Sequence, residues 1–296
     1  MEKIRVLAKI KEIYEQKQNI IRFLKEMDER KYNTVEDIRI SYDFQAGTYT
    51  DRYHRRFDFL QKYAAQLAQT IDQLGNFDTI LEAGVGEATT LGPLLSHLNH
   101  SPKSSFGFDI SWSRVKYGRK FLESIGQPTS GLFVGDLFNI PLKDNSVDIV
   151  YTSHSIEPNG GKEREALEEL YRVAKRYVVL LEPDYELADD KARARMIEHG
   201  YIRNLHGTAR ELGYKVIEHR LFDLSANALN PTGLLIIEKN ATSNHSGFQC
   251  PITKTDLFYK NNAYFSQEAL IAYPTLDNIP CLLPEHAILA TKFLDE

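Results

Sequence analysis

Short apolar runs alternate with helical stretches from Phe77 onward, and this alternation constrains the fold more than any other feature of the chain. The apolar runs read FDTILEAG, SSFGFDI, GLFVGD, VDIVYTSH and RYVVLLEP, and the segments between them mostly read as helix or turn. Strands that alternate with helices indicate a parallel sheet that is covered by helices on both faces. The sequence therefore predicts an α/β domain.

Two more strand-like runs, KVIEHRLFDLS and TGLLIIEKN, follow at residues 215–225 and 232–240. Only a short loop that contains Asn227, Asn230 and Pro231 separates them. A crossover between parallel strands needs a dozen or more residues, so this connection is too short for one. The last pair is therefore expected to be an antiparallel hairpin at one edge of the sheet.

Periodicity and turn residues divide the 296-residue chain into three parts. Residues 1–52 are expected to form a helical extension, because Ile4, Ala8 and Ile13 fall on one side of a charged helix. This extension can pack on the main domain, cover an active site as a lid or pair with another copy, and periodicity does not choose among these. Residues 53–240 form the main domain. After the polar linker NATSNHSG, residues 247–296 carry short aromatic and branched runs that indicate a small β-rich domain.

The composition, with 42% hydrophobic and 26% charged residues, is typical of a soluble globular protein. No apolar run approaches the roughly 20 residues of a membrane span, and residues 1–18 are too charged for a signal peptide. We therefore expect no membrane contact and a cytoplasmic location. A formal charge of −5 disfavours binding to a nucleic-acid backbone. Cys250 and Cys281, the only cysteines, cannot by themselves complete a four-thiolate zinc site.

The first strand runs into a glycine turn, ILEAGVGEATTL, at residues 80–91. Gly84 and Gly86 let the backbone approach a ligand, and the helix that follows offers free N–H groups and a positive dipole end. A dinucleotide-binding loop has a third glycine or alanine where this chain has Thr89. Glu82, at the end of the strand, would repel a pyrophosphate but can pair with a cation.

Acidic residues end the next strands, at the edge where open α/β sheets bind ligands. Asp109 ends FGFDI, where a carboxylate can accept hydrogen bonds from both hydroxyls of a ribose. Asp136 ends LFVGD, where it or the backbone of Leu137 can meet an adenine edge. With Glu82, these residues describe a site for an adenosine that bears a charged amino-acid tail. Taken singly, Glu82 is explained equally by a helix dipole and Asp109 by a helix N-cap.

At these residues the sequence resembles the class I S-adenosylmethionine-dependent methyltransferases, over about residues 77–240. LEAGVGEA resembles the family's glycine loop, with Ala88 in place of its last glycine, and FDIS resembles its ribose-binding strand end. The resemblance implies a Rossmann-like, mostly parallel seven-stranded sheet with an antiparallel terminal hairpin, and S-adenosyl-L-methionine as the cofactor. Tyr42 and Tyr49 resemble an aromatic segment that folds over the cofactor, although core packing explains them equally. The cofactor-binding residues expected are Tyr42, Tyr49, Glu82, Gly84, Gly86, Asp109, Ile110, Ser111, Asp136, Leu137 and Ser153.

The acceptor is expected beyond the fourth strand, at TSHSIEP. His154 is the leading candidate for a general base because imidazole titrates near neutral pH, with Glu157 to orient it or bind substrate. The alternative is that His154 caps a helix or contacts the cofactor. Glu182, with Asp184 and Tyr185 near it, can shape the acceptor pocket or begin a helix. The later candidates, each of which an exposed helix face or a turn also explains, are His199, Tyr201, Arg203, His206, Asn227 and Asn230.

The segment at about residues 248–288 resembles the small domain typified by the tRNA-methyltransferase activator protein. The resemblance rests on CPITKTDLFY and AYPTLDNIPCLLPEHA, with Thr253 at the family's second cysteine and Asn278 at a glycine. The missing thiolate argues against zinc, and no metal is expected. The resemblance implies a docking or stabilising module attached in cis, of a kind that partners methyltransferases acting on RNA and proteins. This module or the N-terminal helices can also join copies into a homo-oligomer.

These features together predict an S-adenosylmethionine-dependent methyltransferase that acts on a small-molecule acceptor. The acidic charge favours a metabolite over nucleic acid, and we expect O-methylation of a sugar or a biosynthetic intermediate. The alternatives are a methyltransferase acting on RNA or protein and a non-catalytic cofactor-binding partner of another methyltransferase. A nicotinamide-dependent oxidoreductase is disfavoured by Glu82 and Thr89.

Overall fold

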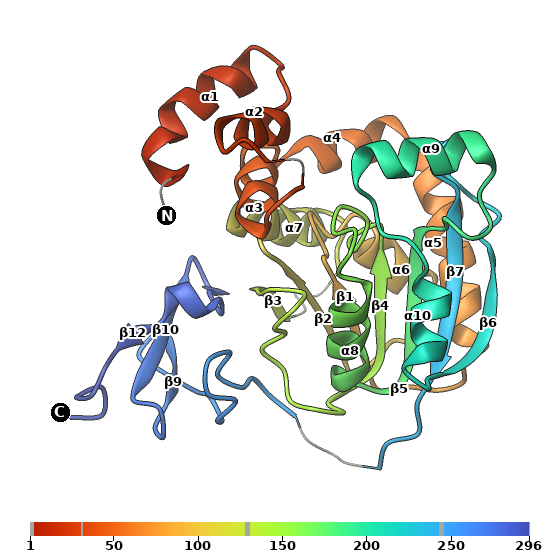
Figure 1. The fold of residues 1–296 in the computed structure, drawn as a ribbon. Helices are drawn as coiled ribbons and strands as arrows, with labels where there is room; N and C mark the ends of the chain where they lie inside the picture. Colours follow the sequence, from red (N-terminus) through yellow and green to blue (C-terminus); the bar gives the residue numbers. More distant parts are fainter. Residues whose placement is uncertain (1–2, 31, 128–130, 243–245, 296) are drawn as a thin grey trace.

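The structure is a computed structural model that describes residues 3–30, 32–127, 131–242 and 246–295. Within these residues the main domain forms a seven-stranded sheet in the order β3-β2-β1-β4-β5-β7-β6 (Figure 1). Strands β1 to β5 run parallel, and β7 runs antiparallel to both of its neighbours. The mostly parallel sheet and the antiparallel hairpin at its edge are thereby confirmed. The strands are β1 (Thr79–Ala83), β2 (Ser104–Asp109), β3 (Gly131–Val134), β4 (Val147–Ser153), β5 (Ala174–Pro183), β6 (Lys215–Leu221) and β7 (Thr232–Glu238).

Helices cover both faces of the sheet because successive residues of a strand point to opposite sides. Ile80 and Ile149 belong to the hydrophobic core beneath α5, α6 and α7, whereas Leu81 and Val150 belong to the core beneath α8 and α10. Helix α9 lies above the carboxyl ends of the parallel strands (Figure 1). These helices are α5 (Phe57–Asp72), α6 (Leu91–His97), α7 (Trp112–Ser124), α8 (Glu163–Val173), α9 (Asp190–His199) and α10 (Leu205–Glu211).

The N-terminal residues are helical, as expected, but the side of the first helix that packs agrees only in part with the prediction. Ile4 is 49% exposed and Ala8 is exposed, whereas Ile10 is buried against Ile20 and Leu24. Ile13 packs against this cluster, as predicted, whereas Ile4 and Ala8 do not. A helix brings residues three or four apart to one side, and Ala8 is five residues from Ile13. The N-terminal elements are η1 (Lys3–Val6), α1 (Leu7–Glu15), α2 (Ile20–Met27), α3 (Val35–Phe44) and α4 (Thr48–Arg55).

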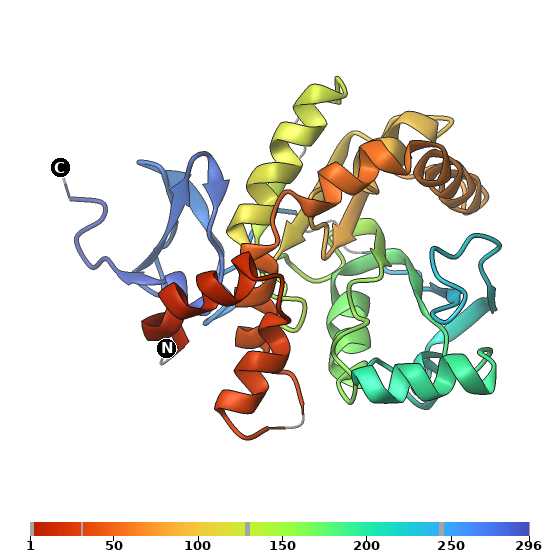
Figure 2. The same cartoon turned by 90° about the horizontal axis from the view of Figure 1, so that it is seen from above.

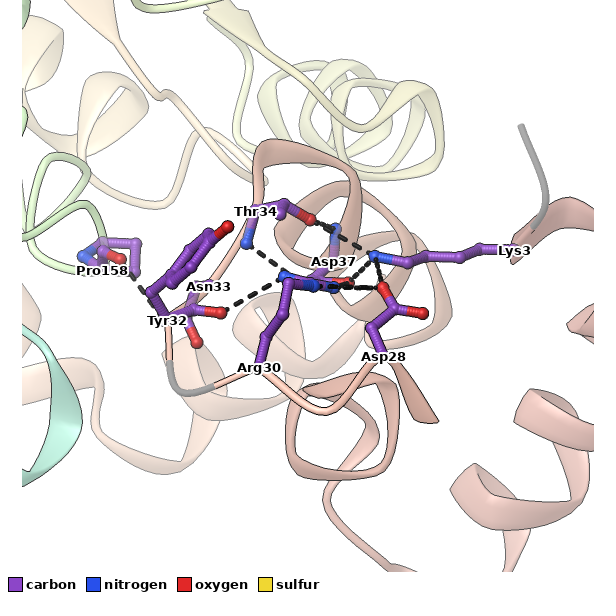
Figure 3. Close-up of polar contacts among 8 residues, drawn as sticks. All are labelled: Lys3, Asp28, Arg30, Tyr32, Asn33, Thr34, Asp37 and Pro158. Carbon is purple, nitrogen blue, oxygen red and sulfur yellow. Dashed lines mark hydrogen bonds and ion pairs between the residues drawn. The ribbon is translucent and has the colours of Figure 1, made fainter. Parts of the chain in front are cut away.

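A buried carboxylate joins these N-terminal helices (Figure 3). Asp37 is fully buried in α3, where it forms ion pairs with Lys3 and Arg30 and accepts a hydrogen bond from the backbone N–H of Thr34. Burial acts to raise the pKa of Asp37, but the hydrogen bonds from Arg30, Lys3 and Thr34 outweigh it and hold the pKa at about 2. The loop before α3 also reaches the main domain, since the Asn33 amide lies 3.4 Å from the carbonyl oxygen of residue 158.

The C-terminal residues form a second, small sheet that docks on the β3 edge of the first (Figures 1 and 2). The N–H of Leu282 donates to the carbonyl of Val134 at 3.0 Å, and Cys281 pairs with Val134 in a parallel bridge. The Cys250 sulfur accepts a hydrogen bond from the Thr253 N–H and lies 3.2 Å from the Tyr273 hydroxyl. None of the helices among the described residues is long and apolar enough to cross a bilayer. The strands are β8 (Phe258–Lys260), β9 (Ala263–Ser266), β10 (Ile271–Leu276), β11 (Ile279–Pro280) and β12 (Ile288–Leu289).

Candidate cofactor and acceptor site

A large cavity opens at the carboxyl ends of β1 to β4. Its volume is about 870 Å³, near the upper end of the roughly 300–1,000 Å³ that small-molecule sites occupy. Residues of α2, α3, α4 and α9 line the side opposite the sheet, and we call these four helices the roof (Figure 2). The predicted residues that line the cavity are Tyr42, Tyr49, Glu82, Gly84, Gly86, Asp109, Ile110, Asp136, Leu137, Ser153, His154 and Glu157.

The glycine loop between β1 and α6 forms the floor of this cavity. Gly84 has a φ of +75°, and a side chain there would place its Cβ 2.2 Å from Cβ of Ser155. Only glycine fits this position, because the loop after β4 passes directly against it. Ala88 also has a positive φ, of +56°, so the replacement of the family's last glycine places an L-residue in left-handed backbone. Gly118 of α7 leaves room for the extra methyl group, since a Cβ there would lie 3.3 Å from that of Ala88.

Asp109 lies at the end of β2 beside this loop. Its carboxylate accepts hydrogen bonds from the backbone N–H groups of Gly86 (3.1 Å) and Ser111 (2.9 Å). Burial raises the pKa of Asp109, while Arg114 and the two N–H groups act to lower it. The alternative that Asp109 caps the next helix is wrong, because Ser111 is the N-cap of α7. The unused lone pairs of a carboxylate held in this way can accept the hydroxyls of a ribose.

Glu82 and Asp136 end the strands on either side of Asp109. Glu82 is buried, and its carboxylate accepts a 2.8 Å hydrogen bond from the Tyr151 hydroxyl. Burial raises the pKa of Glu82 to about 8, although the hydrogen bonds from Tyr151 and the Leu91 N–H act against it. Asp136 accepts the backbone N–H of Phe138 at 3.0 Å, and burial raises its pKa as well. Buried carboxylates of this kind favour a cationic or hydroxyl-bearing ligand over a phosphate.

The predicted tyrosines of the roof enclose a buried arginine. The Arg114 guanidinium lies 4.3 Å from the ring centres of both Tyr42 and Tyr49, and its Nε donates to the carbonyl of Tyr42. Its Nη2 is buried without a hydrogen-bond partner among the residues described. The loop is close by, since a Cβ at Gly86 would lie 3.7 Å from Nη1 of Arg114. An anionic group of a ligand beside Gly86 can therefore satisfy this guanidinium.

A second buried charge fastens the roof to the glycine loop. Glu87 is fully buried, and its carboxylate accepts hydrogen bonds from the backbone N–H groups of Gly47 (2.9 Å) and Thr50 (2.7 Å) and from the Thr50 hydroxyl (2.9 Å). Gly47 is the N-cap of α4, so the carboxylate lies at the positive end of that helix. The glycine loop thus holds the helix that carries Tyr49.

His154 and Glu157 form a hydrogen-bonded pair at the end of β4. His154 Nδ1 lies 2.9 Å from the Glu157 carboxylate, and Nε2 lies 2.9 Å from the Thr232 hydroxyl. Burial acts to lower the pKa of His154, but the hydrogen bond with Glu157 outweighs it and the pKa is raised. Glu157 also interacts with the Tyr201 hydroxyl and the Asn230 amide, and both of these residues line the cavity. His154 has a φ of +55°, a strained backbone of the sort that occurs at functional sites.

Two predicted site residues, Glu182 and Ser111, lie behind the described lining of the large cavity. Glu182 is buried and accepts the backbone N–H groups of the loop after β4, at Ser155, Ile156 and Glu157. It therefore holds the His154 loop in place. Ser111 is also buried, and it caps α7 by accepting the N–H of Arg114.

The later candidates divide between two places. His199, Tyr201, Asn227 and Asn230 line the large cavity. Arg203 and His206 line a separate hollow of about 20 Å³, together with Asp184, Tyr185 and Glu182. In that hollow the Asp184 carboxylate lies 2.7 Å from His219 Nε2, and Glu186 accepts the N–H groups that begin α10. The ligand atoms of Asp184, Glu186 and His219 lie within 4.8 Å of one another. Their hydrogen bonds explain this cluster without an ion.

Sequence reasoning missed the buried charges that shape the roof. Glu87 lies within the glycine motif GVGEA, so a carboxylate facing the loop was a readable signal. Arg114 had no such signal, because Tyr42 and Tyr49 come from a segment far away in the sequence. Arg195 lies only six residues from Tyr201, but it is one of several charged residues on its helix and the pattern does not single it out. Arg52 lies near the predicted Tyr49, but a single charged residue on a helix is usually solvated.

Comparison with known proteins identifies the kind of domain. Residues 80–177, from β1 into β5, match a family model described as a methyltransferase domain. No curated protein matches the sequence. Magnesium protoporphyrin IX methyltransferase from Synechocystis PCC 6803 with bound SAH is similar in structure, at 16% identity and a TM-score of 0.52, over 68% of this chain and 99% of that one. A chain from a complex of the Haloferax volcanii Trm112 methyltransferase activator with a protein assigned as a methyltransferase is also similar in structure. Its identity to this chain is 18% and the TM-score is 0.49, over 69% of this chain and 100% of that one.

Proposed function

We propose that this chain is an S-adenosylmethionine-dependent methyltransferase and that it transfers the methyl group to an oxygen of a small polar acceptor. One observation carries the proposal: a single cavity holds both the Asp109 carboxylate beside the glycine loop and the His154–Glu157 pair. The first is suited to a nucleoside, and the second is suited to a group that must lose a proton.

The residues of the cavity fit the cofactor. We propose that Asp109 accepts the ribose hydroxyls, that Asp136 and Leu137 meet the adenine, and that Glu82 attracts the amino group of the tail. Arg114 can then pair with the carboxylate of the tail, which accounts for its unsatisfied Nη2. S-adenosylmethionine supplies a methyl group on a sulfonium, and the protein has to bind, align and desolvate the reactants. Alignment of this kind can contribute about 7 to 11 kcal/mol.

Transfer to a hydroxyl forms a C–O bond, breaks the C–S bond and releases the hydroxyl proton. We propose that His154 takes this proton, with Glu157 fixing the ring through Nδ1 so that Nε2 is the accepting nitrogen. The Thr232 hydroxyl now meets Nε2, so it must turn away when the acceptor arrives. Glu182 acts as a positioning residue, because it holds the backbone of Ser155, Ile156 and Glu157.

We propose that the C-terminal module, which resembles the methyltransferase activator domain, stabilises the main domain in cis. Its support is the hydrogen bond from Leu282 to Val134 and the packing of Ile279, Cys281 and Leu283 into the core of the first sheet. Action on RNA or protein, or on no acceptor, remains the alternative for a chain with such a module. A homo-oligomer and a cytoplasmic location stay predictions from the sequence.

Titration calorimetry with S-adenosylmethionine and with NAD tests the cofactor. We expect binding of the first only, and we expect Asp109→Ala to weaken it at least tenfold, whereas the exposed residue change Asp58→Ala leaves it unchanged. Methyl transfer is then measured with panels of sugars, phenols and tRNA. Turnover of tRNA alone would overturn the small-molecule assignment, and full cofactor affinity in Asp109→Ala would overturn the site.

A further inference from the structure

The cavity is divided by charge, with basic side chains on the roof and acidic ones on the sheet edge. Arg22 and Lys25 come from α2, Arg52 comes from α4, Arg56 follows α4, and Arg195 comes from α9; all of them line the cavity. Among the described roof residues, Glu198 is the one acidic side chain that lines the cavity. At the sheet edge the cavity is lined by the acidic side chains Glu82, Asp109 and Asp136.

The sheet-edge acids accept hydrogen bonds from the protein, whereas in the part of the chain that the structure describes three of the roof cations have no acidic partner and a fourth has a buried N–H group without any partner. Lys25, Arg52 and Arg56 form no ion pair with any residue that the structure describes, whereas Arg22 pairs with Glu26. Nη1 of Arg195 is buried and lacks a hydrogen-bond partner within the described chain. A buried, unsatisfied guanidinium N–H costs free energy, so an anion that binds it is favoured.

Aromatic rings hold these guanidinium groups in place. Arg52 lies 5.7 Å from the ring centre of Tyr49, and Arg195 lies 5.5 Å from that of Tyr201. A guanidinium has five N–H donors, so Arg195 can interact with the Tyr201 hydroxyl and still offer Nη1 to a carboxylate or phosphate. The Tyr201 hydroxyl interacts with both Arg195 and Glu157, and Glu157 is the partner of the proposed proton acceptor His154.

We propose that the methyl acceptor is an anion and that Arg195 binds its carboxylate or phosphate group, with Lys25, Arg52 and Arg56 adding attraction from the other roof helices. This proposal rests on the proposed methyl transfer, because it assigns the charge of the acceptor. Arg114 beside the glycine loop can pair with the carboxylate of the cofactor, so that carboxylate does not account for Arg195, which comes from α9 and lies against Tyr201.

The test measures anion binding separately from cofactor binding. Calorimetry follows pyrophosphate and citrate, as phosphate and carboxylate probes, binding to the full chain alone and loaded with S-adenosylhomocysteine. We expect at least one probe to bind, and we expect Arg195→Gln to weaken it at least tenfold and Arg52→Gln severalfold. The exposed neighbours Lys191→Gln on α9 and Arg55→Gln on α4, which lie outside the described cavity lining, serve as matched controls and should bind the probes as the wild type does.

The preferred probe shows whether the acceptor carries a phosphate or a carboxylate. The proposal would be overturned if neither probe bound the wild type. It would also be overturned if Arg195→Gln bound the probes as tightly as the wild type does. A loss of S-adenosylhomocysteine affinity in Arg195→Gln would also overturn it, because the arginine would then serve the cofactor. If the wild type binds the probes but not S-adenosylhomocysteine, the anion site stands and the proposed function fails.

Discussion

Replacement of Glu87 tests whether the roof is fastened to the cofactor loop by one buried carboxylate. In Glu87→Gln, the side-chain oxygen can still accept from Thr50, but the new NH₂ group faces the N–H of Gly47. One hydrogen bond to a charged group is lost and two donors are brought together. A charged hydrogen bond contributes about 1.5–3 kcal/mol, so we expect α4 to open more easily by about 2 kcal/mol, or roughly 30-fold.

Hydrogen exchange with mass spectrometry measures this opening. Peptides that cover residues 46–56 should exchange about 30-fold faster in Glu87→Gln, and faster still in Glu87→Ala, which leaves the groups at Gly47 and Thr50 without a partner. Peptides from α5 should be unchanged. The exposed, weakly paired Glu123→Gln on α7 is the control, since a pair of this type contributes about 1 kcal/mol or less. Unchanged exchange over residues 46–56 in Glu87→Ala would refute the reasoning.

Three further changes have defined outcomes. The lowered pKa of Asp37, about 2, contributes about 2 kcal/mol of stability that is present above pH 4 and lost as the pH falls toward 2. In urea unfolding, Asp37→Asn should show this loss at neutral pH, and its free energy of unfolding should change less with pH between about 4 and 2 than that of the wild type. Ala88→Gly should raise the free energy of unfolding by about 1 kcal/mol because φ is positive there; a lower melting temperature would contradict this. The raised pKa of His154 predicts a rate that rises with pH to a midpoint above 6.5, the usual value for histidine. Glu157→Gln should move that midpoint down, and an upward shift would exclude the pair.

The fold could be predicted because its signals are local. Each strand of the main sheet is a short apolar run, and the short connection at Asn230 excludes a crossover, so the sheet and its terminal hairpin follow from the sequence. The sheet half of the cavity follows as well, since the carboxyl ends of parallel strands meet at one edge and bring Glu82, Asp109 and Asp136 together.

The sequence indicated Tyr42 and Tyr49 of the roof, but not the contacts that hold the roof, because these join segments far apart in the sequence. Glu87 meets Gly47 at a separation of 40 residues, and Tyr42 meets Arg114 at a separation of 72. The packed side of the first helix was predicted only in part, because Ile13 contacts the cluster but Ala8, five residues before it, lies on another side of the helix. The C-terminal module docks on β3 because β3 lies at an edge of the sheet. The pattern of apolar residues in the sequence does not show which strand lies at the edge.

The division of charge in the cavity has a consequence for the proposed reaction. A sulfonium is positive and the acceptor oxygen becomes negative as His154 removes its proton, so charge is neutralised as the methyl group moves. A low-dielectric site strengthens the attraction between these charges, and exclusion of water removes the hydration that would stabilise them apart. We expect the roof to exclude that water when the reactants are bound, and Glu87 ties α4 of the roof to the loop that faces the cofactor. Loosening the roof should therefore slow methyl transfer itself, beyond any loss of affinity, and Glu87→Gln should lower kcat as well as raise KM.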